Sequence, residues 1–142
     1  MIELILDVIF LCILAMCSIT DLKKRIIPNY AAACLFLLGL LQITVLLVSG
    51  ESILPNILAV AVSLFGLIAW RCGKIGGGDI KLLLGIGLYL GIWRMAISCI
   101  GMALPCLIFL LWQLIRKYRP ERVPLAPFLL IGCIFTVILT YF

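Results

Sequence analysis

Six apolar stretches separated by short polar breaks make up almost the whole of this 142-residue chain. Their approximate bounds are residues 2–20, 30–48, 53–70, 80–93, 95–115 and 124–142. A helix that crosses the hydrocarbon core of a membrane needs about 20 mostly apolar residues, so these stretches are the right size for single spans. The breaks are too short to hold a soluble domain. The pattern therefore predicts an all-α polytopic membrane protein, with six transmembrane helices forming a single domain over residues 1–142.

Composition and charge fit a lipid-embedded chain and predict its orientation. Hydrophobic residues make up 66% of the sequence and charged residues only 12%, which lies outside the range of soluble domains. Cytoplasmic loops retain Lys and Arg, and of the 11 such residues only Arg94 lies outside the first, third and fifth breaks. Both termini are therefore expected on the extracytoplasmic side. The net charge of +5 predicts anchoring to anionic lipids, at about 1 kcal/mol per basic residue near the surface, rather than binding of nucleic acid.

The inventory of reactive side chains leaves carboxylates as the candidates for catalysis. The chain contains no histidine, which excludes Ser-His-Asp, Cys-His and His-Glu-x-x-His chemistry. Its seven cysteines are scattered, without a Cys-x-x-Cys pair, and six of them lie inside apolar stretches. This distribution is typical of small packing residues rather than of a zinc site or a disulfide framework. We therefore expect no metal and no cofactor.

Two of the six acidic residues stand apart because of where the apolar stretches begin and end. Asp21 closes the first stretch and Asp79 opens the fourth, so the predicted topology puts both at the cytoplasmic interface. They would meet if the first and fourth helices pack together. Asp7 is fourteen residues from Asp21 on the same predicted helix, about 21 Å at 1.5 Å per residue, and is not expected to join them. For either aspartate taken alone, an ordinary interfacial charge balanced by neighbouring lysines is an equally good interpretation.

A run of three glycines, Gly76, Gly77 and Gly78, precedes Asp79. Residues without side chains permit a tight turn and the close approach of a bound extended peptide, which makes the run a candidate substrate-binding element. Its alternative interpretation is a flexible loop. Lys81 lies two positions after Asp79, so on a regular helix its side chain points elsewhere. Three roles are open for Lys81: binding a lipid phosphate, which we favour, stabilising negative charge on the aspartates, or meeting an acidic residue of a substrate.

Pro28 and Asn29 are expected to start the second helix. Proline has no N–H to leave unsatisfied in a first turn, and an asparagine side chain can cap the turn that follows. A role in gating a substrate is the alternative for this pair.

Three segments of the chain together resemble a known family. Segment 21–29 reads Asp-Leu-Lys-Lys-Arg-Ile-Ile-Pro-Asn, an aspartate followed by a basic stretch and Ile-Pro-Asn. Segment 76–82, Gly-Gly-Gly-Asp-Ile-Lys-Leu, fits a GxGDxK pattern, and segment 123–128, Val-Pro-Leu-Ala-Pro-Phe, is a proline-rich helix entry. In this order, and over nearly the whole chain, they resemble the type IV prepilin peptidase (leader peptidase) family of GxGD aspartyl membrane proteases.

The resemblance implies a membrane aspartyl endopeptidase of the bacterial or archaeal cytoplasmic membrane. Its partner would be a membrane-inserted prepilin, whose short basic leader it removes at the cytoplasmic face, with Asp21 and Asp79 in the matching catalytic positions. The cytoplasmic methyltransferase domain of the long bacterial form has no counterpart in this sequence. We therefore expect the short form, with peptidase activity alone, acting on Flp-type (tight-adherence) or archaeal flagellin-like substrates. The sequence leaves the oligomeric state open.

The expected mechanism uses the two aspartates as a pair. Two adjacent carboxylates do not both ionise cheaply, so one acts as a base toward water and the other as an acid toward the scissile carbonyl. The partial charges of helix ends assign the negative charge to Asp79, at a helix N-terminus, and the proton to Asp21, at a helix C-terminus.

Two alternatives belong to other classes. A presenilin-like intramembrane protease also uses GxGD, but its Tyr-Asp and Pro-Ala-Leu motifs do not occur in this sequence. A non-enzymatic small transporter or pilus-assembly membrane subunit would use the aspartates to bind an ion or a partner, and the sequence offers no inverted repeat or broken helix in its support.

Overall fold

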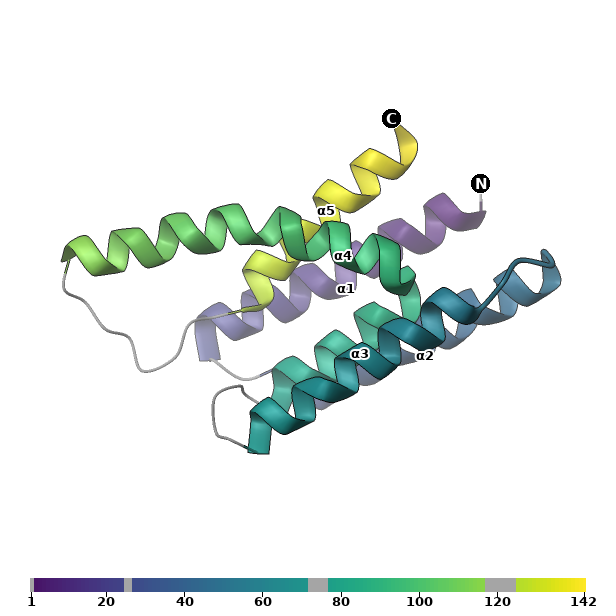
Figure 1. Cartoon of the computed structure of the whole chain (residues 1–142), viewed down its shortest axis with the longest axis horizontal. Coiled ribbons are helices and arrows are strands. Elements are labelled where there is room, and N and C mark those ends of the chain that lie inside the picture. The colour runs from purple at the N-terminus through teal and green to yellow at the C-terminus, as the bar shows by residue number, and fades with distance from the viewer. Residues whose placement is uncertain (1, 25–26, 72–76, 117–124) are drawn as a thin grey trace.

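The structure is a computed structural model that describes residues 2–24, 27–71, 77–116 and 125–142. Within these ranges all regular structure is helical, which confirms the predicted all-α class. Five helices follow one another along the chain (Figure 1). They are α1 (Ile2–Lys24), α2 (Asn29–Val48), α3 (Leu54–Arg71), α4 (Gly77–Arg116) and α5 (Ala126–Tyr141).

The helices differ in their capacity to cross a membrane. By length and hydropathy, three described segments are long and apolar enough: Glu3–Lys24, Asn29–Val48 and Gly77–Ile115. Two further apolar segments, Leu54–Phe65 and Ala126–Tyr141, are shorter. Helices suit this environment because all their interior backbone groups are hydrogen-bonded within the segment. Many large apolar side chains on the outside of the bundle are exposed, as expected for a surface that faces lipid.

The fourth and fifth predicted spans form one helix, α4, which is interrupted at Gly91. Gly91 has φ 72° and ψ 172°, a combination that essentially only glycine adopts. The residues before and after it, 77–90 (α4a) and 92–116 (α4b), run in opposite directions along the long axis of the molecule (Figure 1). The predicted bounds put the boundary between these two spans at residue 94, which is three positions too late. Hydropathy marks the charged Arg94, whereas the reversal needs the backbone angles of Gly91.

A side chain from α3 satisfies the backbone at this break. Leu88 lies in the last turn before the break at Gly91, where carbonyl groups lack regular partners within a helix. The buried amide of Asn56 donates to the Leu88 oxygen instead, at 2.8 Å. Asn56 thus has a tertiary role beyond the helix punctuation that its Leu-Pro-Asn context indicates.

The two halves of α4 pack against different neighbours. α4a lies between α2 and α3, where a Cβ added to Gly87 would lie 3.0 Å from Ser63 Oγ, and one added to Gly85 would lie 3.0 Å from Leu35 Cβ. These two glycines permit close approach of α4a to α3 and to α2. α4b packs along α5, where a Cβ on Gly132 would clash with the Ser98 carbonyl oxygen.

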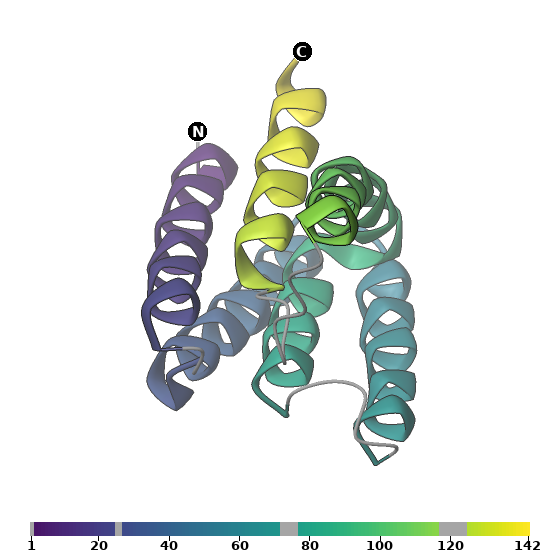
Figure 2. The same cartoon turned by 90° about the vertical axis from the view of Figure 1, so that its left-hand side faces the viewer.

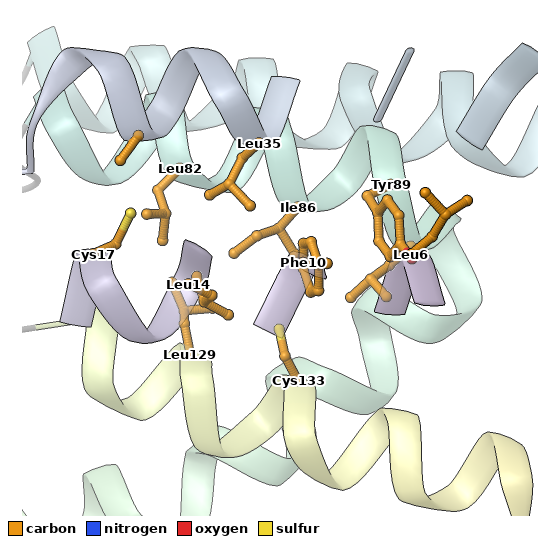
Figure 3. Close-up of a cluster of buried hydrophobic side chains, with 12 residues drawn as sticks. Leu6, Phe10, Leu14, Cys17, Leu35, Leu82, Ile86, Tyr89, Leu129 and Cys133 are labelled. Atoms are coloured by element: carbon orange, nitrogen blue, oxygen red, sulfur yellow. The ribbon is translucent and has the colours of Figure 1, made fainter. Parts of the chain in front are cut away.

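The core is a lengthwise cluster of buried apolar side chains contributed by α1, α2, α4a and α5 (Figure 3). Backbone contacts join α1 to α2 and α5, whereas α1 and α4a meet chiefly through the side chains of this cluster. Figure 3 shows Leu6 and Tyr89 near one end of the cluster and Cys17 and Leu82 near the other.

The ends of the helices gather at two poles of the bundle. The C-terminal end of α1 and the N-terminal ends of α2, α4 and α5 lie at one pole, on the left in Figure 1 and toward the viewer in Figure 2. Both chain termini lie at the opposite pole (Figure 1). Residues that the sequence separates by a hundred positions are thereby brought to one end of the molecule.

Candidate active site

Asp21 lies in the last turn of α1 and is only 7% exposed. Its Oδ2 accepts a hydrogen bond from the backbone N–H of Ala126, the first residue of α5, at 3.3 Å. The first N–H groups of a helix have no acceptor within the helix, and a negative charge is favoured there. Asp21 therefore fastens the end of α1 to the start of α5.

This contact changes the expected division of charge between the aspartates. Helix-end reasoning gave the proton to Asp21 because it considered only the C-terminus of the helix to which Asp21 belongs. The N-terminus of α5 acts in the opposite sense on the same carboxylate. The helix ends consequently no longer distinguish Asp21 from Asp79, which lies in the first turn of α4.

The start of α4 lies against the connection between α1 and α2. A Cβ added to Gly78 would lie 3.1 Å from the Cβ of Ile27, so the two backbones approach closely here. Asp79 follows immediately and is partly buried. Gly77 and Gly78 belong to the first helical turn, so at these two positions the glycine run opens a helix rather than forming the expected tight turn. Gly76 lies outside the described residues.

Lys81 has a partner that sequence reasoning did not consider. Its Nζ donates to the Oδ1 of Asn29 at 3.0 Å, which ties the first turns of α4 and α2 together at the exposed surface. Pro28 and Asn29 do begin α2, as predicted, but the expected asparagine cap was wrong. Pro28 occupies the capping position, with extended backbone angles and no side-chain capping hydrogen bond.

A contact between α1 and α4a near the opposite pole relates the positions of Asp21 and Asp79 along these two helices. Phe10 of α1 stacks on Tyr89 of α4a, with ring centroids 4.4 Å apart and planes 9° apart. The two segments run in opposite directions (Figure 1). From this pair, Asp21 is eleven residues onward and Asp79 ten residues back, or about 16.5 Å and 15 Å at 1.5 Å per residue. Asp21 and Asp79 therefore lie on the same side of this contact, at similar distances from it along their helices.

In the described parts of the chain, the cysteines form neither a disulfide nor a metal site. The six described cysteines are free thiols, and two of them, Cys17 and Cys133, are core residues, in agreement with a packing role. Cys72 lies outside the described residues. In the described ranges, no three His, Cys, Asp or Glu side chains are grouped so that they could hold a metal ion.

The pole that holds the end of α1 and the start of α4 thus carries two carboxylates, Asp21 and Asp79, beside the first turns of α2 and α5. Such a pair can activate water for attack on a peptide carbonyl. A comparison with protein families matches residues 8–141 to the type IV leader peptidase family, and the match includes both aspartates. Comparisons with curated proteins and with solved structures found no match. Since the family match covers nearly all of the sequence, the chain belongs to the type IV leader peptidase family, whose members are aspartic-type prepilin peptidases.

Proposed function

We propose that this protein is a membrane aspartyl endopeptidase that removes the basic leader from type IV-like prepilins of the Flp/Tad type, at the cytoplasmic face of the membrane. The observation that carries the proposal is the position of Asp21 and Asp79 at one pole of the bundle, at the end of α1 and the start of α4. The Phe10–Tyr89 contact, from which the two aspartates are similarly far along their helices, supports it. Family membership supplies the reaction and the substrate class.

The proposal includes six spans, in which α4a and α4b each cross the membrane. The reversal of α4 at Gly91 supports this arrangement. It is further supported by the position of both chain termini at the pole opposite Asp21 (Figure 1). With basic residues at the Asp21 pole, among them Lys23 and Lys24 in the last turn of α1, the positive-inside rule directs that pole to the cytoplasm.

In the proposed reaction, Asp21 and Asp79 act together on water and on the scissile peptide. The ionised carboxylate removes a proton from the water, whose oxygen bonds to the carbonyl carbon, while the protonated carboxyl gives its proton to the carbonyl oxygen. The tetrahedral diol then breaks its C–N bond, and the proton taken from water passes to the leaving amine. One hydroxyl of the diol returns its proton to the other aspartate as the carboxyl C=O bond forms. Both aspartates regain their starting states, with a carboxylic acid and an amine as products.

We further propose that the extended leader passes beside the first turns of α4 and α2. Gly77 and Gly78 offer backbone without side chains and are partly exposed, which suits close approach of a peptide. Pro28 and Asn29 border the same place through the Asn29–Lys81 hydrogen bond. Gly76 belongs to the proposed binding element because it is the first glycine of the GxGDxK pattern.

The test is co-expression with a prepilin from the same genome, followed by mass measurement of the pilin N-terminus. Asp21→Asn and Asp79→Asn preserve side-chain size and should each leave the precursor intact, while wild type releases the mature pilin. Glu51→Gln is the matched control, because it makes the same kind of change at an exposed site beyond the far end of α2, and should leave processing unchanged. Cleavage by either folded aspartate variant would refute the pair, and an intact precursor with wild type would refute the peptidase.

A further inference from the structure

A buried carboxylate near the pole opposite the candidate active site joins three helices. Asp7 of α1 is 3% exposed. Its Oδ1 accepts a hydrogen bond from the Tyr89 hydroxyl of α4a at 2.6 Å, and its Oδ2 accepts one from the Tyr141 hydroxyl of α5 at 2.9 Å. A buried acidic group inside a membrane segment is costly, so its retention calls for a role. The proposed reaction gives it none, because Asp7 is about 21 Å from Asp21 along α1.

Two side chains of α1, spaced three residues apart, contact Tyr89. Asp7 binds its hydroxyl, and Phe10, almost one turn further along, stacks on its ring. Tyr89 lies two residues before the break at Gly91. The end of α4a is thus held against α1 by a short hydrogen bond to the Tyr89 hydroxyl and by a ring contact together.

Two hydrogen bonds join α1 to α5, one near each pole, and the Asp7 carboxylate accepts one of them. Asp7 binds Tyr141 near one pole, and Asp21 binds the N–H of Ala126 near the other. Fourteen residues separate the two attachment points on α1 and fifteen separate those on α5, which correspond to about 21 Å and 22.5 Å of helix. Because these two distances are nearly equal, both hydrogen bonds form together, and sliding α1 along α5 would break both of them.

The apolar contacts between these ties do not fix the axial position by themselves. The packing of Leu14, Ile86 and Leu129 is non-directional, and lipid is as apolar as the core, so exposing such side chains to lipid carries little cost. Hydrogen bonds of 2.6 and 2.9 Å do resist a slip of one residue, which would move the groups by about 1.5 Å. Fixing register is the best-attested use of buried polar groups.

We propose that Asp7 is a positioning residue for catalysis: with Tyr89 and Tyr141 it sets the axial register of α1 against α4a and α5, and hence the level of Asp21 against Asp79. The proposal rests on the proposed function for its assignment of the reaction to those two aspartates. Misplacement of reacting groups by about 1 Å can cost on the order of 100-fold in rate. The rate of cleavage should therefore depend strongly on the axial position of α1.

The test measures kcat and KM for cleavage of a purified prepilin, per folded enzyme molecule, in one detergent. Asp7→Leu removes both hydrogen bonds and should lower kcat roughly 10- to 100-fold with little change in KM. Asp7→Asn retains one acceptor for Tyr89 and can donate to the Tyr141 oxygen, so it should keep kcat within about threefold of wild type. A role in stability alone would lower the folded fraction without producing this split or this rescue.

Ser98→Ala is the matched control. It removes a buried polar contact, Ser98 Oγ to Cys133 Sγ at 3.2 Å, that joins α4b to α5 without involving α1, and it should keep the wild-type kcat. If Asp7→Leu does not fold, Tyr89→Phe and Tyr141→Phe each remove one hydroxyl and keep the ring, and each should lower kcat by a smaller factor.

The outcomes separate this proposal from the proposed function. Wild-type kcat in Asp7→Leu, or in both tyrosine variants, would overturn the positioning role while Asp21→Asn and Asp79→Asn still abolish cleavage. An Asp7→Asn enzyme as slow as Asp7→Leu would also overturn it, because charge rather than register would then matter. An inactive wild type, or cleavage by Asp21→Asn, would instead refute the proposed function.

Discussion

Replacing Gly91 by alanine should destabilise the protein by about 1–3 kcal/mol, the cost of holding another residue at backbone angles that essentially only glycine adopts. Gly91 has φ 72° and ψ 172° at the reversal between α4a and α4b. A Cβ there would lie 3.3 Å from Asn56 Oδ1 and 3.5 Å from Pro55 Cβ, which is close but not a clash, so we assign most of the cost to the backbone. The expected loss corresponds to a decrease of roughly 5- to 150-fold in the ratio of folded to unfolded protein.

The measurement is unfolding of purified protein in mixed detergent and SDS micelles, followed by circular dichroism. Gly50→Ala is the matched control, since Gly50 also has a positive φ of 74° but has no neighbouring atom within 4 Å of an added Cβ. This exposed loop residue can relax, so the control should lose less stability than Gly91→Ala. Equal stability of Gly91→Ala and wild type, or equal losses in the two variants, would refute the assignment of the reversal to a conformation reserved for glycine.

The length of α4 explains why the reversal matters to the whole molecule. As one straight helix its 40 residues would extend about 60 Å, about twice the roughly 30 Å thickness of the hydrocarbon core. In the proposed six-span arrangement, the reversal lets both halves occupy the same thickness of membrane. It also directs α4b back along α5, where Gly132 permits close contact. A chain that lost the reversal would therefore lose the α4b–α5 interface as well.

Three further predictions concern the same scaffold. Asn56→Leu leaves the Leu88 carbonyl without the donor that reaches it at 2.8 Å and should cost about 1–3 kcal/mol in the same unfolding assay, whereas no change would show that water or another donor replaces it. Gly132→Val should abolish the yield of folded protein in detergent size-exclusion chromatography, because its Cβ would clash with the Ser98 carbonyl oxygen; a normal yield would contradict this packing. Lys81→Met removes an exposed hydrogen bond to α2 and should change stability by less than about 1 kcal/mol, so a large loss of cleavage with normal stability would assign Lys81 to substrate binding.

Hydropathy predicted most of the helices but not the exact place of the reversal. The apolar stretches gave the bounds of α1, α2 and α3 closely, because a lipid-facing helix must be apolar along its whole length. At the reversal the decisive property is the backbone angle of Gly91, and hydropathy does not report backbone angles. Arg94 looked like the break because it is charged, yet it lies three residues beyond it.

Short local patterns mark the two aspartates as candidates in the sequence, whereas no pattern marks the residues that contact the acidic side chains. Asp79 is marked by the glycines before it, and Asp21 by the basic stretch and Ile-Pro-Asn after it. The partners of the acidic side chains come from distant parts of the sequence: Tyr89 is 82 positions from Asp7, and Ala126 is 105 positions from Asp21. A single sequence carries no periodic or compositional signal for such pairings.

The Asp21–Ala126 contact also alters how the pair should be understood electrostatically. Asp79 lies at the N-terminus of α4, and Asp21 binds the N-terminus of α5, so each carboxylate is close to the positive end of a helix dipole. Both helix ends favour negative charge, while in the proposed pair mutual repulsion between the two carboxylates would favour one shared proton. Because the helix ends act similarly on Asp21 and Asp79, they assign neither aspartate permanently as base or as acid. This suits the proposed reaction, in which the two residues exchange these roles during each cycle. Moving the N-terminus of α5 away from Asp21 would remove this balance, so under the proposed mechanism the register of α1 against α5 is an electrostatic as well as a geometric requirement.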